Sequence, residues 1–93
     1  MDERERVLKL FDQIDHDRVE VTARSIWIYF ANGTHLGVQR PSEEHPDLTP
    51  IILMNTHTMQ PIERVRAPKG TIKATIQRLI ALGEEMTCHK TAP

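Results

Sequence analysis

The chain has 93 residues, of which 39% are hydrophobic and 27% charged, so it suits one small folded domain and not a disordered segment. Its formal net charge of −1 disfavours both a uniformly basic nucleic-acid-binding protein and an acidic nucleic-acid mimic. A single cysteine, Cys88, excludes an internal disulfide framework and a zinc site made of several cysteines. We expect a soluble, cytoplasmic protein for two reasons. A membrane-spanning helix needs about 18 consecutive apolar residues, and no apolar run in the sequence approaches that length. The N-terminus also lacks the apolar core of a signal peptide.

The first predicted element is an amphipathic helix from about Glu3 to Asp15. Asp2 and Glu5 are spaced as in a capping box, with aspartate in place of serine or threonine, which predicts where this helix begins. The apolar residues of one face recur at helical spacing; they are Val7, Leu8, Leu10, Phe11 and Ile14.

Strands follow this helix. They are predicted at residues 19–30, 34–40 and about 51–59, while residues 62–66 form either a short edge strand or an extended linker. Asn32 and Gly33 predict a two-residue type I′ hairpin turn between the first two strands, because both residues tolerate a positive φ. Pro61 interrupts the third strand.

A second amphipathic helix is predicted after Pro68, with Thr71 as an alternative cap. Its apolar face consists of Ile72, Ile76, Leu79 and Ile80. Gly83 predicts its end, since glycine commonly terminates helices. We therefore expect a single domain at residues 1–86 and a flexible C-terminal tail at residues 87–93.

These elements predict an α+β domain of order α-β-β-β-(β)-α, with an antiparallel three- to four-stranded sheet packed with two helices. The strand at 19–30 is apolar on both faces: Ile26, Ile28 and Phe30 share one face, and Trp27 and Tyr29 share the other. If both helices cover one face, the second face must contact another molecule. The alternative is one helix on each face, since the sequence does not set the strand order or the covered face.

Positive charge is concentrated in one segment. Residues 61–93 carry six basic and three acidic residues, whereas residues 1–60 carry six and ten. Five of the basic residues, with no acidic residue among them, lie between positions 64 and 78; they are Arg64, Arg66, Lys69, Lys73 and Arg78. Such a segment suits an anion or a phosphate backbone, although charge runs also occur on ordinary solvated surfaces.

No catalytic or metal-binding motif is present. Lys69, Gly70 and Thr71 resemble the end of a phosphate-binding loop, but Arg64 stands where that motif needs its first glycine. The histidines show no metal-binding spacing, and neither serine lies in a nucleophile motif. We therefore predict no catalytic residue, no metal and no cofactor, which favours a non-enzymatic protein without excluding an enzyme.

The expected function is a small binding module that acts through protein–protein contact, as a homodimer or on another protein, of an accessory, inhibitor or adaptor type. Its interface residues would be Trp27 and Tyr29, because large aromatic side chains dominate buried contacts. The alternative is a nucleic-acid-binding protein that uses the basic 64–78 segment and stacks bases on these rings. A second alternative is a small ligand-binding domain or an enzyme without a recognisable motif.

Overall fold

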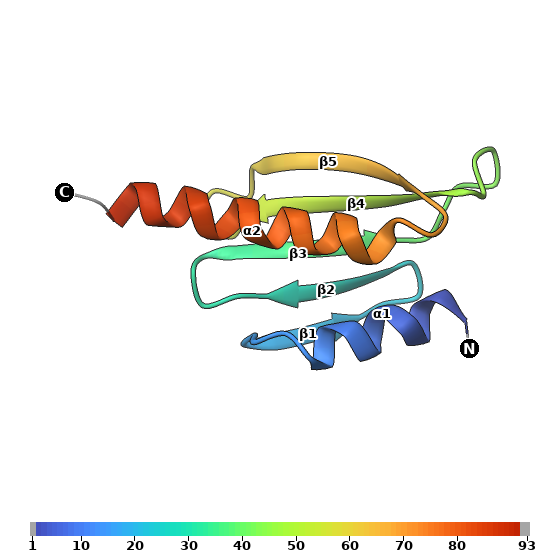
Figure 1. Ribbon diagram of the computed structural model, residues 1–93, viewed down its shortest axis with the longest axis horizontal. Helices are drawn as coiled ribbons and strands as arrows, with labels where there is room; N and C mark the ends of the chain where they lie inside the picture. The colour runs from blue at the N-terminus through green and yellow to red at the C-terminus, as the bar shows by residue number, and fades with distance from the viewer. Residues whose placement is uncertain (1, 92–93) are drawn as a thin grey trace.

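Five strands separate the two helices in the computed structural model, which describes residues 2–91 and the side chains up to residue 87. The elements are α1 (Glu3–Asp12), β1 (Arg18–Val21), β2 (Ser25–Tyr29), β3 (Thr34–Gln39), β4 (Leu48–Asn55), β5 (Pro61–Pro68) and α2 (Ile72–Thr91). All neighbouring strands pair antiparallel in the order β1-β2-β3-β4-β5 (Figure 1). The predicted α+β class with two helices is confirmed, but the predicted number of three to four strands is too low.

One missing strand comes from the predicted strand at 19–30, which is in fact the hairpin of β1 and β2. Thr22 makes the turn: its amide donates to the Ser25 carbonyl at 2.8 Å, and its Oγ1 accepts from the Ser25 amide at 3.0 Å. From α1, the Arg4 guanidinium donates to the Thr22 carbonyl at 2.7 Å. A threonine side chain replaces the glycine or proline that usually marks a turn, so the sequence reads as one continuous strand.

The hairpin between β2 and β3 has a three-residue loop and not the predicted two-residue turn. The Gly33 amide donates to the Phe30 carbonyl at 3.3 Å, and the Phe30 amide donates to the Thr34 carbonyl at 3.0 Å. Gly33 has a φ of 87°, whereas Asn32 does not have the positive φ that a type I′ turn requires. This is the type I turn with a bulged glycine, and it sets Tyr29 opposite His35.

The fourth predicted segment, 62–66, is part of a full strand, β5. Near the start of β5, its pairing with β4 shifts register between Leu53 and Met54. Pro68 ends β5 instead of beginning the second helix, and Gly70 then adopts a φ of 89° before α2 begins at Ile72.

Both helices differ in length from their predictions. The Asp2 side chain caps α1 as expected, accepting from the Glu5 amide at 2.9 Å, but α1 ends at Asp12 and not at Asp15. The second helix continues through Gly83 to Thr91. Gly83 is buried where α2 approaches Thr34 and Leu53, so tertiary contact with the sheet maintains the helix there. The predicted boundary between a domain at 1–86 and a tail at 87–93 stays a prediction: residues 87–91 are helical, and 92–93 lie outside the described residues.

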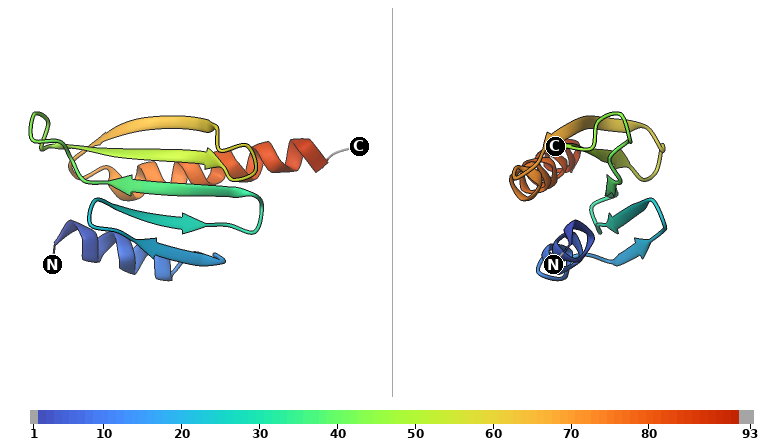
Figure 2. Two further views of the ribbon diagram at one scale, coloured as in Figure 1. Left: turned by 180° about the vertical axis from the view of Figure 1, so that it is seen from behind. Right: turned by 90° about the vertical axis from the view of Figure 1, so that its right-hand side faces the viewer.

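The two helices lie on the same face of the sheet, α1 beside β1 and β2 and α2 beside β3, β4 and β5 (Figure 2). They enclose one core, whose fully buried large side chains are Phe11, Ile26, Ile28, Leu36, Ile51, Leu53, Ile76 and Leu79. Each such side chain stabilises the fold by about 1.5–3 kcal/mol. The arrangement with one helix on each face is therefore wrong. Over the described residues, neither helix combines the length and apolar character that crossing a bilayer requires.

Candidate interaction face

The face of the sheet opposite the helices, here called the open face, presents aromatic, apolar and charged side chains. Its residues are Arg18 and Glu20 of β1, Trp27 and Tyr29 of β2, His35 and Gly37 of β3, Ile52 and Met54 of β4, and Arg64 and Arg66 of β5. The strand register aligns five of them in one row across the sheet: Glu20, Trp27, Gly37, Ile52 and Arg64. The apolar residues occupy the central strands, and the charged residues occupy the two edge strands.

Trp27 lies over the neighbouring strand at Gly37. A Cβ atom placed on Gly37 would fall 2.4 Å from Cζ3 of the indole, which is closer than a Cβ atom approaches a non-bonded atom in proteins. The indole Nε1 donates to the Ser25 Oγ at 2.8 Å, and Ser25 is itself 9% exposed. The polar edge of Trp27 is therefore satisfied within its own strand, and its half-buried ring forms the apolar centre of the open face.

Tyr29 is enclosed between the strands on its two sides. The Arg18 guanidinium lies 3.9 Å from the centre of its ring, and the His35 imidazole stacks on it at 4.8 Å with an angle of 17° between the planes. Arg18 and His35 come from opposite sides, because Tyr29 pairs with Arg18 in β1 and with His35 in β3. The Tyr29 hydroxyl donates to Glu20, which also pairs with Arg18. Burial, followed by the Glu20 carboxylate, raises the pKa of Tyr29, so its hydroxyl remains a donor.

His35 is buried beside the rings of Trp27 and Tyr29, with 3% of its surface exposed. Its Nδ1 lies 2.8 Å from the Thr56 Oγ1, and its ring centre lies 5.5 Å from that of Trp27. Burial is the main reason that its pKa is lowered, and the Arg18 charge acts in the same direction. A neutral imidazole thus belongs to the packing of the open face.

The predicted anion-binding residues do not form one cluster. Arg64 and Arg66 are exposed on the open face, opposite Ile52 and Pro50. Lys69 and Lys73 lie on the helix side, in a cleft beside α1. Arg78 forms an ion pair of 2.7 Å with Glu63, also on the helix side. The sheet therefore separates two of the five cations from the other three.

The open face can provide contact area. Among the residues that the structure describes, no group of three or more histidine, cysteine, aspartate or glutamate side chains is placed to hold a metal ion. Every buried side-chain nitrogen or oxygen in the described part of the chain has a hydrogen-bond partner. An aromatic centre flanked by arginine and a charged margin matches the composition of protein interfaces.

Sequence reasoning placed Trp27 and Tyr29 on the face opposite Ile26 and Ile28, as the structure has them. It did not find Arg18, His35 or Gly37, which position the two rings. His35 and Gly37 could have been found from the register of the hairpin between β2 and β3. With the observed three-residue loop, one residue longer than predicted, His35 lies opposite Tyr29 and Gly37 lies opposite Trp27.

Comparison with known proteins adds no relative: no protein-family model matches the sequence, and neither a curated protein nor a solved structure shows significant similarity to it.

Proposed function

We propose that this protein is a non-enzymatic binding module that acts through protein–protein contact, and that a second copy of the chain occupies its open face. The observation that supports this most is the half-buried Trp27 at the centre of a sheet face that carries no helix. Exposed apolar surface on a small monomer favours association, because association removes that surface from water.

The charges at the two margins favour one geometry of self-association. Arg64 and Arg66 give the β5 edge two positive charges, whereas Glu20 and Arg18 form an ion pair on the β1 edge and neutralise each other. A two-fold axis parallel to the strands sets the β5 edge of one copy opposite the β1 edge of the other. An axis across the strands would instead bring the four arginines of two β5 edges together, which like-charge repulsion disfavours. We therefore infer a dimer whose strands run parallel to its axis.

The area of the open face limits the strength of this contact. Five strands about 4.8 Å apart and about 20 Å long give roughly 500 Å² on each copy. A standard interface buries about 800 Å² per partner, and smaller ones are weak or transient. The expected dissociation constant is therefore in the micromolar range.

The experiment compares a methionine on the open face with a methionine outside it. Met54 is a partly buried open-face residue, and Met59 is an exposed loop residue outside that face. Met54→Ser should weaken dimerisation at least tenfold in size-exclusion chromatography with light scattering, whereas Met59→Ser should leave it unchanged. Equal effects of the two substitutions, or none, would refute the open face as the contact surface.

Single-stranded nucleic acid is a second candidate, favoured by one observation: Arg64 shares a cross-strand row with Trp27. Cations beside an exposed ring are typical of proteins that bind unpaired bases. Two features weaken this reading, since Arg18 and His35 cover both sides of Tyr29 and three of the five cations lie beyond the sheet.

Fluorescence anisotropy with a labelled 20-nucleotide oligothymidylate tests the second candidate. Nucleic-acid binding through the open face requires an affinity that falls steeply between 50 and 200 mM salt and that Arg64→Gln with Arg66→Gln abolishes. Absence of binding at 50 mM salt, or binding that this double variant retains, would exclude this use of the open face.

A further inference from the structure

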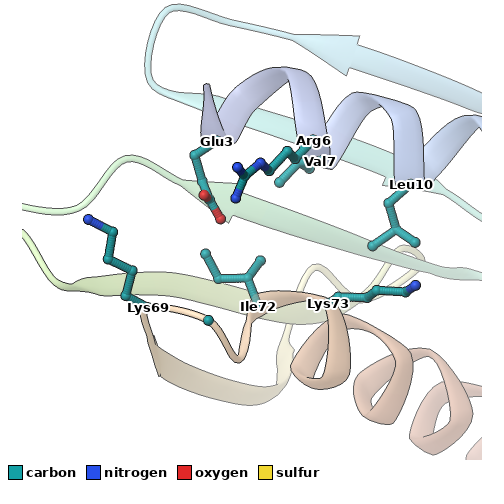
Figure 3. A pocket seen from close by; sticks show the side chains of 8 residues that line it. Glu3, Arg6, Val7, Leu10, Lys69, Ile72 and Lys73 are labelled. Atoms are coloured by element: carbon teal, nitrogen blue, oxygen red, sulfur yellow. The ribbon is translucent and has the colours of Figure 1, made fainter. Parts of the chain in front are cut away.

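The helix side of the molecule contains a cleft between the beginnings of α1 and α2. Its volume is about 340 Å³, which is within the range of small-molecule sites. Its lining comes from Glu3, Arg6, Val7 and Leu10 on one side and from Lys69, Gly70, Ile72 and Lys73 on the other (Figure 3). It forms because α1 lies over β1 and β2 whereas α2 lies over β3 to β5, so the two helices do not close on each other. We call it the inter-helix cleft.

Three cations and one carboxylate line the inter-helix cleft. Arg6, Lys69 and Lys73 are exposed, and none of them forms an ion pair with another described residue. Glu3 is the one carboxylate of the lining. The cleft therefore carries an excess of two positive charges on a chain whose net charge is −1. An anion bound there reduces the mutual repulsion of these cations.

The floor of the inter-helix cleft is apolar. Val7 and Ile72 belong to the core, and Leu10 packs against it. Figure 3 shows Leu10 directed from α1 towards α2 and Ile72 directed from α2 towards α1. The Glu3 carboxylate lies beside the Arg6 guanidinium, and Lys69 and Lys73 extend towards opposite ends of the gap (Figure 3). An inorganic anion would satisfy the cations but leave this apolar surface in water, so the lining suits a molecule that has both characters.

We propose that the inter-helix cleft binds a small organic anion, a carboxylate carried on a short alkyl chain. The carboxylate lies between Arg6 and Lys69, within the longer-range attraction of Lys73, and the alkyl chain covers Leu10 and Ile72. Each fully buried methylene group increases affinity about fourfold, so affinity depends on chain length as well as charge. This site lies on the opposite side of the sheet from the open face. The proposed anion binding can therefore be tested separately from the proposed dimer.

The test is a titration of the ¹⁵N-labelled full chain with octanoate, followed by amide NMR shifts. Saturable shifts should occur at Val7, Leu10, Gly70 and Ile72. Hexanoate should bind about three- to fifteen-fold more weakly, because it lacks two methylene groups, and inorganic phosphate at least tenfold more weakly. Unsaturable shifts, or phosphate binding as tight as octanoate binding, would overturn the proposal.

Matched variants distinguish the cleft from general attraction of anions. Lys69→Gln with Lys73→Gln should weaken octanoate binding about tenfold or more. Arg64→Gln with Arg66→Gln removes the same charge from the open face and should leave the affinity unchanged. Equal losses in the two double variants would show that net charge, and not the inter-helix cleft, governs binding.

Discussion

Trp27 and Gly37 form a complementary pair: the indole occupies the space that any side chain at position 37 would need, with its Cζ3 only 2.4 Å from the site of a Cβ. The apolar centre of the open face therefore depends on a glycine in the middle of the neighbouring strand. Glycine within a strand often marks such a close approach.

Gly37→Ala should displace the Trp27 ring and break its hydrogen bond to Ser25. Forcing a methyl group into a packed position costs about 1–3 kcal/mol. Urea unfolding measures the loss of stability, and fluorescence of Trp27, the one tryptophan of the chain, reports the change in its surroundings. An unchanged emission spectrum together with unchanged stability would contradict the described packing.

Gly83→Ala should have the opposite effect. A Cβ at Gly83 would lie 3.4 Å from the Thr34 Oγ1, which is at the limit of ordinary contact. Because α2 continues through this position, alanine should stabilise the protein by about 0.5–1 kcal/mol. Thermal unfolding gives the measurement. Destabilisation would mean that α2 lies closer to the sheet than described, or that the helix ends at Gly83.

Thr22→Val should destabilise the turn between β1 and β2 by about 1–2 kcal/mol, because it removes the hydroxyl that accepts from the Ser25 amide while preserving the shape of the side chain. Urea unfolding measures this loss. Thr58→Val is a matched control in an exposed loop, where the hydroxyl accepts one longer bond of 3.3 Å. Similar small effects of both substitutions would show that Thr22 does not define the turn.

The stability of the protein should fall as the pH falls below the ordinary histidine pKa of about 6.5, in part through His35. Burial lowers the pKa of His35 in the folded state, so the unfolded chain binds a proton first and acid favours unfolding. His35→Gln should flatten the dependence of the urea midpoint between pH 7.5 and 5.5. An NMR titration that shows the pKa of His35 at or above 6.5 would disprove this account.

Periodicity predicted the helices and the two faces of β2 because burial imposes it on the sequence: Ile28 and Trp27 alternate between core and open face. It did not predict the strand number or the register. These depend on single side chains, such as the Thr22 hydroxyl that turns the chain. They also depend on the three-residue loop that ends at Gly33, since a loop one residue shorter would have paired Tyr29 with Leu36.

The division of the basic segment was not predictable from spacing either. Arg64 and Arg66 alternate along β5 and share the open face, whereas Lys69 and Lys73 follow the strand and belong to the start of α2. The spacing of the basic residues between positions 64 and 78 therefore did not indicate that they lie on two sides of the sheet. Only the position at which β5 ends, at Pro68, separates them.

Sedimentation equilibrium of the unmodified protein over about 1–200 µM tests the central claim, that a second copy covers the open face, most directly. The account predicts a mass that rises with concentration from 10.7 kDa towards twice that value, with a micromolar dissociation constant. A mass of 10.7 kDa at every concentration would contradict it, because the open face would then be stable in water without a second copy.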